Sequence, residues 1–150
     1  MTCLSVLVII VHTDMLPFAI SLQPGFSLYE QVVYAAKKAI VSGRMLPGQA
    51  FPSVRTLSVE LKINPNTAHK VVTHLLEQGL LEVRPGSGTF VVSPQGSPPE
   101  EKSRLINQET ERLAVEAMRL GLTLAEVTAA LIAHWQRLEK HSSAGEVKKK

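Results

Sequence analysis

The sequence predicts a mainly α-helical protein with one small β-hairpin, built as a larger N-terminal part and a C-terminal pair of helices. Three observations lead to this prediction. Apolar residues recur at helical spacing between helix caps, two β-rich runs flank a glycine-rich turn, and a Ser/Pro/Gly-rich stretch separates the two parts. With 45% hydrophobic residues in 150, the chain has enough apolar material for one ordinary domain or two small ones.

Residues 1–15 are expected to form an extension that is disordered or adds an edge strand, and Met15 is an alternative start. The apolar run from Cys3 to Val11 is shorter than the about 20 residues that a membrane span needs. It also lacks the preceding basic residue of a signal peptide. The single cysteine excludes an internal disulfide and is compatible with a reducing cytosol. We therefore expect a cytoplasmic protein with no membrane partner.

Residues 16–93 are expected to hold three helices and the hairpin. The first helix begins at the capping box that runs from Ser27 to Glu30, and it ends near Gly43, which can supply the left-handed residue of a helix stop. Ser53 can cap a short second helix. The apolar positions of this second helix are Val54, Leu57, Val59 and Leu61.

The third helix is expected to begin with Asn64 as its N-cap and Pro65 as its first residue, and to stop at Gly79. One face is an apolar stripe of Ala68, Val71, Val72, Leu75 and Leu76. The opposite face carries Asn66, Lys70, Thr73 and His74. Such side chains can meet base edges and phosphates when a helix lies in a major groove. A merely solvated polar face has the same composition, so both interpretations stay open.

Two β-rich runs, Leu80 to Val83 and Thr89 to Val92, are expected to pair around a glycine-rich tip. The glycines of the tip permit positive φ and close backbone approach, and Arg84 places a fixed positive charge beside it. The order helix, helix, short turn, helix, hairpin matches a winged helix-turn-helix. A plain hairpin that contacts nothing is the alternative.

Charge and motif content favour a nucleic-acid partner over catalysis. Residues 28–92 hold seven Lys or Arg against four Glu, whereas residues 100–140 hold six against seven, so only the first part suits a polyanion. Asp14 is the single aspartate, which leaves little for a catalytic triad. His69 and His74 are five residues apart, unlike the i, i+4 pair of a zinc helix. We therefore expect no enzyme activity, no metal and no cofactor.

The motifs of the first part resemble those of the GntR family of bacterial transcriptional regulators. They are Leu28-Tyr29-Glu30-Gln31, Gly43-Arg44, Pro47-Gly48, Pro52-Ser53-Val54-Arg55 and Gly86-Ser87-Gly88-Thr89-Phe90, in the order and spacing of the family. The segment from Asn64 to Thr67 and a C-terminal region of only some fifty residues resemble the small YtrA-type subfamily. The resemblance implies a homodimeric repressor that binds a palindromic operator.

By that resemblance, DNA contacts fall on the second helix, the third helix and the wing. They are Ser53, Arg55, Asn64, Asn66, Thr67, His69, Lys70, Arg84, Gly86, Ser87 and Gly88. Arg55 is the strongest candidate, because a planar guanidinium suits bidentate recognition of phosphate or guanine. Its alternative role is a salt bridge with Glu60 or Glu82. For His69 the alternative is a partly packed surface residue.

Residues 94–99 are predicted to form a linker, because proline and glycine break helices and the stretch has no apolar anchor. Residues 100–140 then predict two helices, with a stop at Gly121 and a second capping box from Thr123 to Glu126. Their apolar stripe is Leu113, Ala117, Leu120, Leu124, Val127, Leu131, Trp135 and Leu138. Residues 141–150 are expected to be a disordered basic tail that adds at most nonspecific attraction to DNA.

Two helices cannot enclose these apolar stripes by themselves, so the stripes need a partner surface. A second copy in a two-fold dimer supplies one, and packing back onto the winged part is the alternative. Two functional hypotheses follow: a dimeric regulator of double-stranded DNA, or a winged-helix protein–protein interaction module. Only the first predicts a steep loss of affinity with salt. The C-terminal helices are too small for a dedicated effector pocket.

Overall fold

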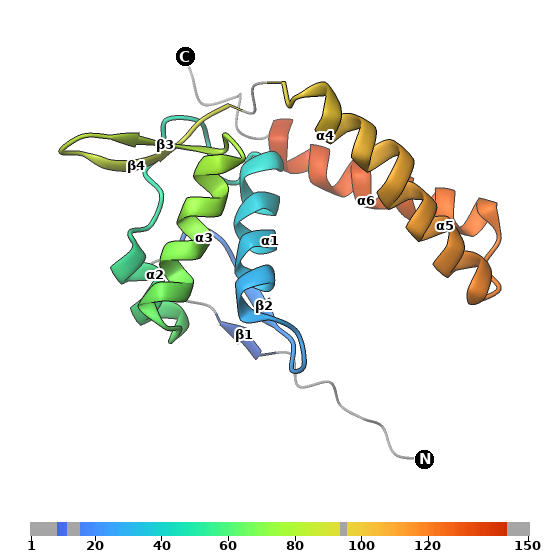
Figure 1. Cartoon of the computed structure of the whole chain (residues 1–150), viewed down its shortest axis with the longest axis horizontal. Coiled ribbons are helices and arrows are strands. Elements are labelled where there is room, and N and C mark those ends of the chain that lie inside the picture. The colour runs from blue at the N-terminus through green and yellow to red at the C-terminus, as the bar shows by residue number, and fades with distance from the viewer. Residues whose placement is uncertain (1–8, 12–15, 94–95, 144–150) are drawn as a thin grey trace.

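The computed structural model describes residues 9–11, 16–93 and 96–143, which form two β-hairpin-like sheets and a set of helices (Figure 1). The elements in chain order are β1 (Ile9–Val11), β2 (Ile20–Leu22), α1 (Leu28–Val41), α2 (Val54–Leu61), α3 (Pro65–Glu77), β3 (Leu81–Arg84), β4 (Gly88–Val91), α4 (Pro99–Arg104), the π-helical segment η1 (Leu105–Glu109), α5 (Thr110–Arg119) and α6 (Leu124–Ser143). The predicted fold class is confirmed: the protein is mainly helical, with a winged helix-turn-helix followed by a C-terminal helical arm made of α4 to α6.

The core lies where α1, α2 and α3 meet. Its largest fully buried apolar side chains come from α1, the loop after it, α2, α3 and β4, and are Val32, Met45, Leu57, Val71, Leu75 and Val91. Burial of side chains of this size is worth about 1.5–3 kcal/mol each. This core therefore holds the three helices and the root of the hairpin in one unit.

Side-chain caps set the three helix starts where the sequence predicts them. Ser27 Oγ accepts a hydrogen bond from the Glu30 N–H at 3.5 Å, and Ser53 Oγ accepts one from the Thr56 N–H at 3.1 Å. Asn64 Oδ1 accepts from the Asn66 N–H at 2.8 Å. Each oxygen satisfies an amide that the first helical turn leaves without a partner.

The short helix α2 differs from its prediction on one side. Leu57 and Leu61 are buried, but Val59 is 64% exposed and takes no part in the core. Two residues along a helix turn the side chain about 200°, so Val59 must lie away from the face that carries Leu57 and Leu61. The helix ends at Lys62, a non-glycine residue in the left-handed region with φ 52° and ψ 43°.

The β3–β4 hairpin is anchored by a third segment of chain. Both strands begin and end one residue away from their predicted bounds, so that Arg84 pairs with Gly88 and only residues 85–87 form the tip. Residues 48–51 run alongside β4, with hydrogen bonds from the Gly48 N–H to Val91 O (2.7 Å) and from the Phe51 N–H to Thr89 O (2.8 Å). This pairing fixes the direction of the hairpin relative to the helices.

A second, two-stranded sheet lies against α1, where strand β1 pairs antiparallel with β2. Ile20 is buried against the helix, and the Phe18 ring stacks on Phe51 with centroids 6.0 Å apart. Of the predicted extension 1–15, residues 9–11 form β1, and the rest, including Cys3, lies outside the described residues.

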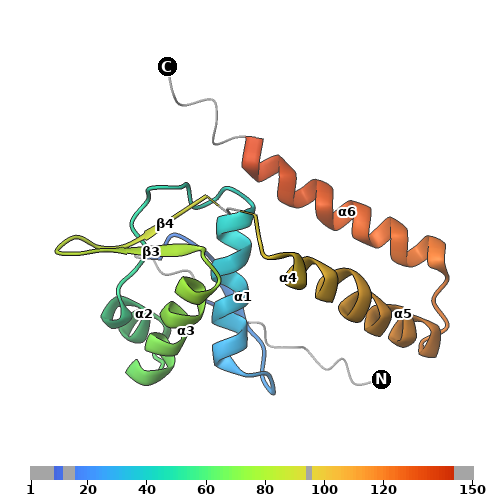
Figure 2. The same cartoon turned by 45° about the horizontal axis from the view of Figure 1, so that its top comes forward.

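The C-terminal arm projects from the side of α1 that is opposite to α2 (Figures 1 and 2). Helix α4 begins at Pro99, the last residue of the predicted linker, and α4, η1 and α5 follow each other without a break. Helix α6 extends to Ser143, three residues into the predicted tail, of which residues 144–150 lie outside the described residues. Across the described part of the chain, no helix is both long enough and apolar enough to cross a membrane.

The start of α6 is the predicted second capping box. Thr123 N–H and Thr123 Oγ1 both donate to Glu126 Oε2 at 2.7 Å, and Thr123 Oγ1 accepts from the Glu126 N–H at 3.3 Å. These hydrogen bonds, the backbone one first, hold the pKa of Glu126 below its ordinary value. The ionised carboxylate therefore stabilises the α5–α6 turn near neutral pH.

We predict that Lys62→Gly raises the free energy of unfolding of the full chain by about 0.5–1 kcal/mol, because glycine adopts positive φ without the Cβ clash that lysine suffers there. Urea unfolding at fixed protein concentration measures the change. Lys62→Ala is the control, since it keeps a Cβ and should gain nothing. Equal stability of the glycine and alanine variants would contradict the prediction.

Candidate nucleic-acid interface

The start of α2, the polar flank of α3 and the β3–β4 hairpin lie together on one side of the molecule. Helix α1 separates them from the C-terminal arm in both views (Figures 1 and 2). The flank of α3 is therefore open to solvent, and none of the helices α4 to α6 covers it. Every predicted DNA contact comes from these three elements.

The polar flank of α3 exposes Asn66, His69 and Lys70, while Thr67 is half-buried. His69 Nδ1 lies 3.5 Å from Thr73 Oγ1, one helical turn further on. His69 is exposed, so the alternative of a partly packed residue does not describe it. The flank thus presents an amide, an imidazole and an ammonium group side by side.

His74 lies at the edge of the polar flank and also takes part in helix packing. Its ring meets the ring of Tyr29 from α1 edge-on, with centroids 6.0 Å apart and an interplanar angle of 74°. The side chain is half-buried and lines a surface hollow together with His69, Lys70 and Thr73. The contact with Tyr29 joins helices that are distant in sequence, so helical periodicity alone does not predict it.

Ser53 and Asn64, the two helix-cap residues among the predicted DNA contacts, already use part of their hydrogen-bonding capacity within the protein. Ser53 Oγ accepts from the Thr56 N–H and also lies 2.9 Å from Thr56 Oγ1. Asn64 Oδ1 accepts from the Asn66 N–H, which leaves the two amide hydrogens of Asn64 available as donors. Both residues are exposed. A phosphate oxygen is an acceptor, so the remaining donor groups suit it.

Arg55 is exposed and, within the described ranges, forms no ion pair. The alternative salt bridge with Glu60 or Glu82 is not formed, because Glu82 pairs with Arg84 instead. Lys70 is likewise exposed and unpaired in this part of the chain. Both cations are therefore available to an anionic partner.

Lys62 adds a cation that the sequence analysis did not single out. It is exposed and lies two residues before the cap of α3, in the left-handed turn between α2 and α3. Among the described residues it has no ion-pair partner. Its position shortly before the predicted start of the third helix could have identified Lys62 as a candidate DNA contact from the sequence.

Arg84 stands beside the tip of the hairpin as expected, but it is ion-paired, which the sequence analysis did not anticipate. Glu82 Oε1 lies 2.7 Å from Arg84 Nε and 2.6 Å from Arg84 Nη2, and the guanidinium carbon sits 4.4 Å from the centre of the Phe90 ring. Glu82 and Arg84 are two residues apart in β3 and so share one face of the hairpin. Their charges cancel there.

The tip of the hairpin is backbone-rich and open. Gly86 and Gly88 have φ of 75° and 113°, and an added Cβ at either would meet nothing within 4 Å. Ser87 is exposed, and its N–H bonds to Arg84 O at 3.0 Å. The conformation requires glycine at both positions, and nothing in the described chain covers the tip.

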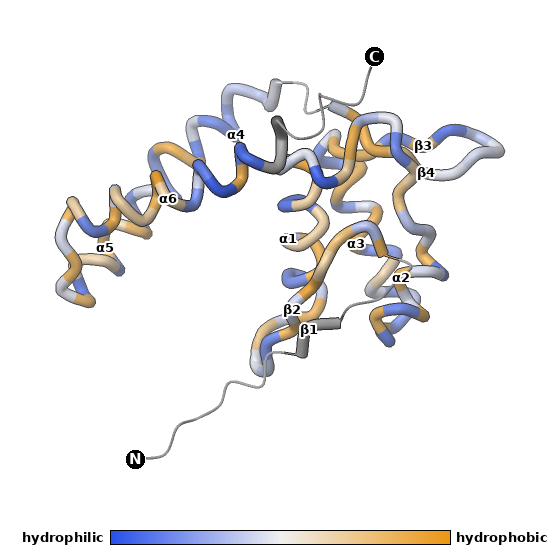
Figure 3. Tube along the Cα trace, turned by 180° about the vertical axis from the view of Figure 1, so that it is seen from behind, coloured by the Kyte–Doolittle hydropathy of each residue, from blue (hydrophilic) through white to orange (hydrophobic). Residues whose placement is uncertain are grey.

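The predicted dimerisation residues of α5, α6 and the turn between them are largely unburied. Hydrophobic and hydrophilic positions alternate along the trace of these two helices (Figure 3). Leu113, Leu120, Leu124, Leu131 and Trp135 are exposed, Val127 and Leu138 are half-buried, and Ala117 is buried. Packing back onto the winged part, the alternative, occurs only to a small extent: α6 contacts α1, but most of these residues stay exposed. The arm therefore keeps an apolar face in solvent.

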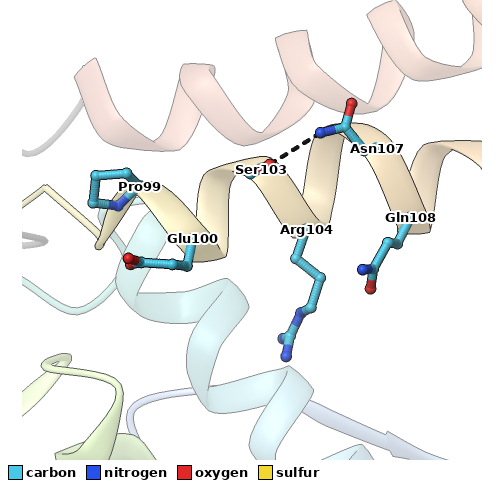
Figure 4. A pocket seen from close by; sticks show the side chains of 6 residues that line it. All are labelled: Pro99, Glu100, Ser103, Arg104, Asn107 and Gln108. Carbon is cyan, nitrogen blue, oxygen red and sulfur yellow. Dashed lines mark hydrogen bonds between the residues drawn. The ribbon is translucent and has the colours of Figure 1, made fainter.

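A polar hollow of about 550 Å³ lies along α4 and η1, on the side that carries Arg104 and Gln108 (Figure 4). Its six lining residues are all exposed, and Asn107 Nδ2 donates to Ser103 Oγ at 3.0 Å on the neighbouring side of the helix. No group of three or more His, Cys, Asp or Glu that could hold a metal ion occurs among the residues described. The hollow is an open surface groove.

Comparison with known proteins agrees with this geometry. Residues 28–91 match the family model of bacterial regulatory proteins of the gntR family. The chain is 31% identical over 105 residues to the uncharacterized HTH-type transcriptional regulator YhcF of Bacillus subtilis, which covers 70% of this chain and 87% of that protein. It is also 31% identical over 101 residues to the HTH-type transcriptional repressor YtrA of the same bacterium, covering 67% of this chain and 78% of that protein.

A solved structure shows the same fold over most of the chain. A Listeria monocytogenes protein described as a transcriptional antiterminator superposes with a TM-score of 0.70 at 23% identity, covering 77% of this chain and 87% of that chain. The predicted family resemblance is confirmed by the family model and by the two relatives, which are HTH-type transcriptional regulators and not enzymes. This chain belongs to the GntR family of bacterial transcriptional regulators.

Proposed function

We propose that the chain is a homodimeric transcriptional repressor that binds a palindromic site in double-stranded DNA. Helix α3 enters the major groove, and the β3–β4 hairpin lies on the adjacent groove or backbone. The observation that carries this proposal is the polar flank of α3, exposed beside the hairpin and away from the C-terminal arm (Figure 2). A single helix of this kind fits a major groove about 12 Å wide.

The exposed groups divide into two kinds of DNA contact. Arg55, Lys62 and Lys70 are unpaired cations within the described chain, and they would neutralise phosphates. Asn66 and His69 are exposed on the polar flank of α3, where their amide and imidazole groups can form hydrogen bonds with base edges. The remaining proposed contacts are to the phosphates. Side chains would donate hydrogen bonds, or the glycine backbone would lie close to the DNA, at Ser53, Asn64, Thr67, Gly86, Ser87 and Gly88.

The apolar face of the arm supports a dimer. Leu124 is 82% exposed, Trp135 64% and Leu120 59%, and such large side chains gain about 1.5–3 kcal/mol each when they are buried. A second copy offers the same face, so an isologous two-fold contact can cover both at once. The two α3 helices would then reach half-sites one helical turn of DNA apart, about 34–36 Å.

Repression is the role named for the relative YtrA, which has similar length and is matched through most of its chain. A dimer of winged helices on a promoter region blocks other proteins from the same DNA by excluded volume.

Selection of bound fragments from a random DNA pool tests this function directly. We expect a palindromic consensus whose half-site centres are about 10–10.5 base pairs apart or a multiple of that spacing, because the dimer axis relates the two recognition helices. Enrichment without symmetry would contradict the dimer, and absence of any enrichment would contradict specific DNA binding.

Arg55→Ala should weaken binding to the selected DNA by about tenfold or more, because it removes a cation next to the duplex, and it should lower the salt slope by about 0.9. A gel-shift titration at several salt concentrations measures both quantities. Arg112→Ala removes an equal charge from an exposed position on α5 and serves as the control. The proposal fails if both variants bind like the original chain, or if salt leaves the affinity unchanged.

Leu131→Asp should convert the dimer to monomers and reduce DNA affinity, because a buried carboxylate without a partner is strongly unfavourable. Sedimentation at known concentration reports the oligomeric state. Val115→Asp changes an exposed residue on the other side of α5 and should leave the dimer intact. A Leu131 variant that remains dimeric would exclude this face as the interface.

A further inference from the structure

Three side chains on one face of the hairpin form a closed cluster. Glu82 faces Phe90 across the strand pair, and Arg84 faces Gly88, which has no side chain. The space over Gly88 lets the guanidinium fold back over the Phe90 ring, where Glu82 Oε1 accepts from both Nε and Nη2. The register of the hairpin therefore determines where the only arginine of residues 81–91 sits.

The ion pair between Arg84 and Glu82 is weak enough for another anion to replace the Glu82 carboxylate. The side chains of Arg84 and Glu82 are 49% and 44% exposed, and ion pairs in that environment are weak. A guanidinium binds carboxylate and phosphate oxygens with the same fork of N–H groups. A DNA phosphate can therefore take the place of the Glu82 carboxylate while the ring of Phe90 keeps the guanidinium oriented.

The pair also removes the charge of the hairpin. Glu82 and Arg84 are the only ionisable residues between Leu81 and Val91, so the net charge of this segment is zero. Arg55 and Lys70 on the neighbouring helices differ in this respect, because neither forms an ion pair within the described residues. Approach of the hairpin to a duplex thus brings one carboxylate close to the phosphates for each guanidinium.

We propose that Glu82 determines how strongly the hairpin binds DNA, by occupying on Arg84 the place of a DNA phosphate until the duplex displaces it. This inference rests on the proposed DNA-binding function and assigns a new role within it. Glu82 lowers the affinity of the hairpin for any duplex, so that binding depends more on the α3 flank that reads the bases. The residue acts through Arg84 and sets specificity by weakening the contact that does not depend on sequence.

A double-mutant cycle tests the proposal. Binding of a 20-base-pair duplex of arbitrary sequence is measured by fluorescence anisotropy at low salt and at several higher salt concentrations. Glu82→Gln should raise the affinity about three- to fivefold and steepen the salt slope by about 0.9, which corresponds to one more phosphate neutralised. In the Arg84→Gln background the same substitution should have only the small effect of removing one carboxylate, as at the control position, because the guanidinium that it releases is gone.

Glu77→Gln, at the end of α3, is the matched control, since it removes an exposed carboxylate that has no ion-pair partner in the described chain. Its effect should be smaller and independent of Arg84. A gain from Glu82→Gln that persists undiminished without Arg84 would reduce Glu82 to a general repulsive charge and overturn the proposal. A loss of affinity would overturn it too, by showing that Glu82 positions Arg84 for DNA.

The arbitrary duplex separates this proposal from the proposed function. An Arg84-dependent gain on this duplex, together with failure to select a palindromic site, would support the role of Glu82 and contradict sequence-specific repression. Selection of a palindrome without the Arg84-dependent gain would do the reverse. If the original chain does not bind the arbitrary duplex at low salt, the role proposed for Glu82 is wrong, whereas the selection experiment alone decides the proposed function.

Discussion

The amphipathic packing of α3 is the constraint on which the rest of the structure depends. Ala68, Val71 and Leu75 lie on one side of the helix and are completely buried. Because an α-helix turns 100° per residue, burial of that side forces Asn66, His69 and Lys70 outward. Any change that rotated α3 in the core would cost buried apolar contacts. The orientation of the candidate DNA-binding flank is thus a consequence of hydrophobic burial.

The hairpin is tied to the same core, which makes flank and wing one surface. Leu81 and Val91 are buried at its root, and residues 48–51 pair with β4 as a short third strand. The tip beyond Arg84 has no such support and relies on the positive φ of its glycines. The buried root fixes the direction of the hairpin relative to α3, and the tip presents its backbone to solvent. The Glu82–Arg84 pair makes the net charge of the hairpin zero.

The C-terminal arm differs from the winged part, because its helices form without burying most of their apolar side chains. Its last helix, α6, is well capped at Thr123, yet the apolar side chains of the arm stay largely in solvent. Local hydrogen bonds are enough to define helices, but they cannot bury a stripe that has no facing surface. This incompleteness distinguishes the arm from the winged part, and it is the physical reason for proposing a second copy as its partner.

The sequence by itself determined the helix starts, the helix stops at Gly43 and Gly79, and the winged helix-turn-helix order, because caps, turns and periodicity act between residues close in the chain. Only the tertiary structure decided that His74 packs on Tyr29 and that Glu82 neutralises Arg84 over Phe90. The sequence analysis also did not predict the π-helical turn of the arm. Each of these outcomes depends on which of several neighbours a side chain meets after folding, and that competition is settled in space and not along the chain.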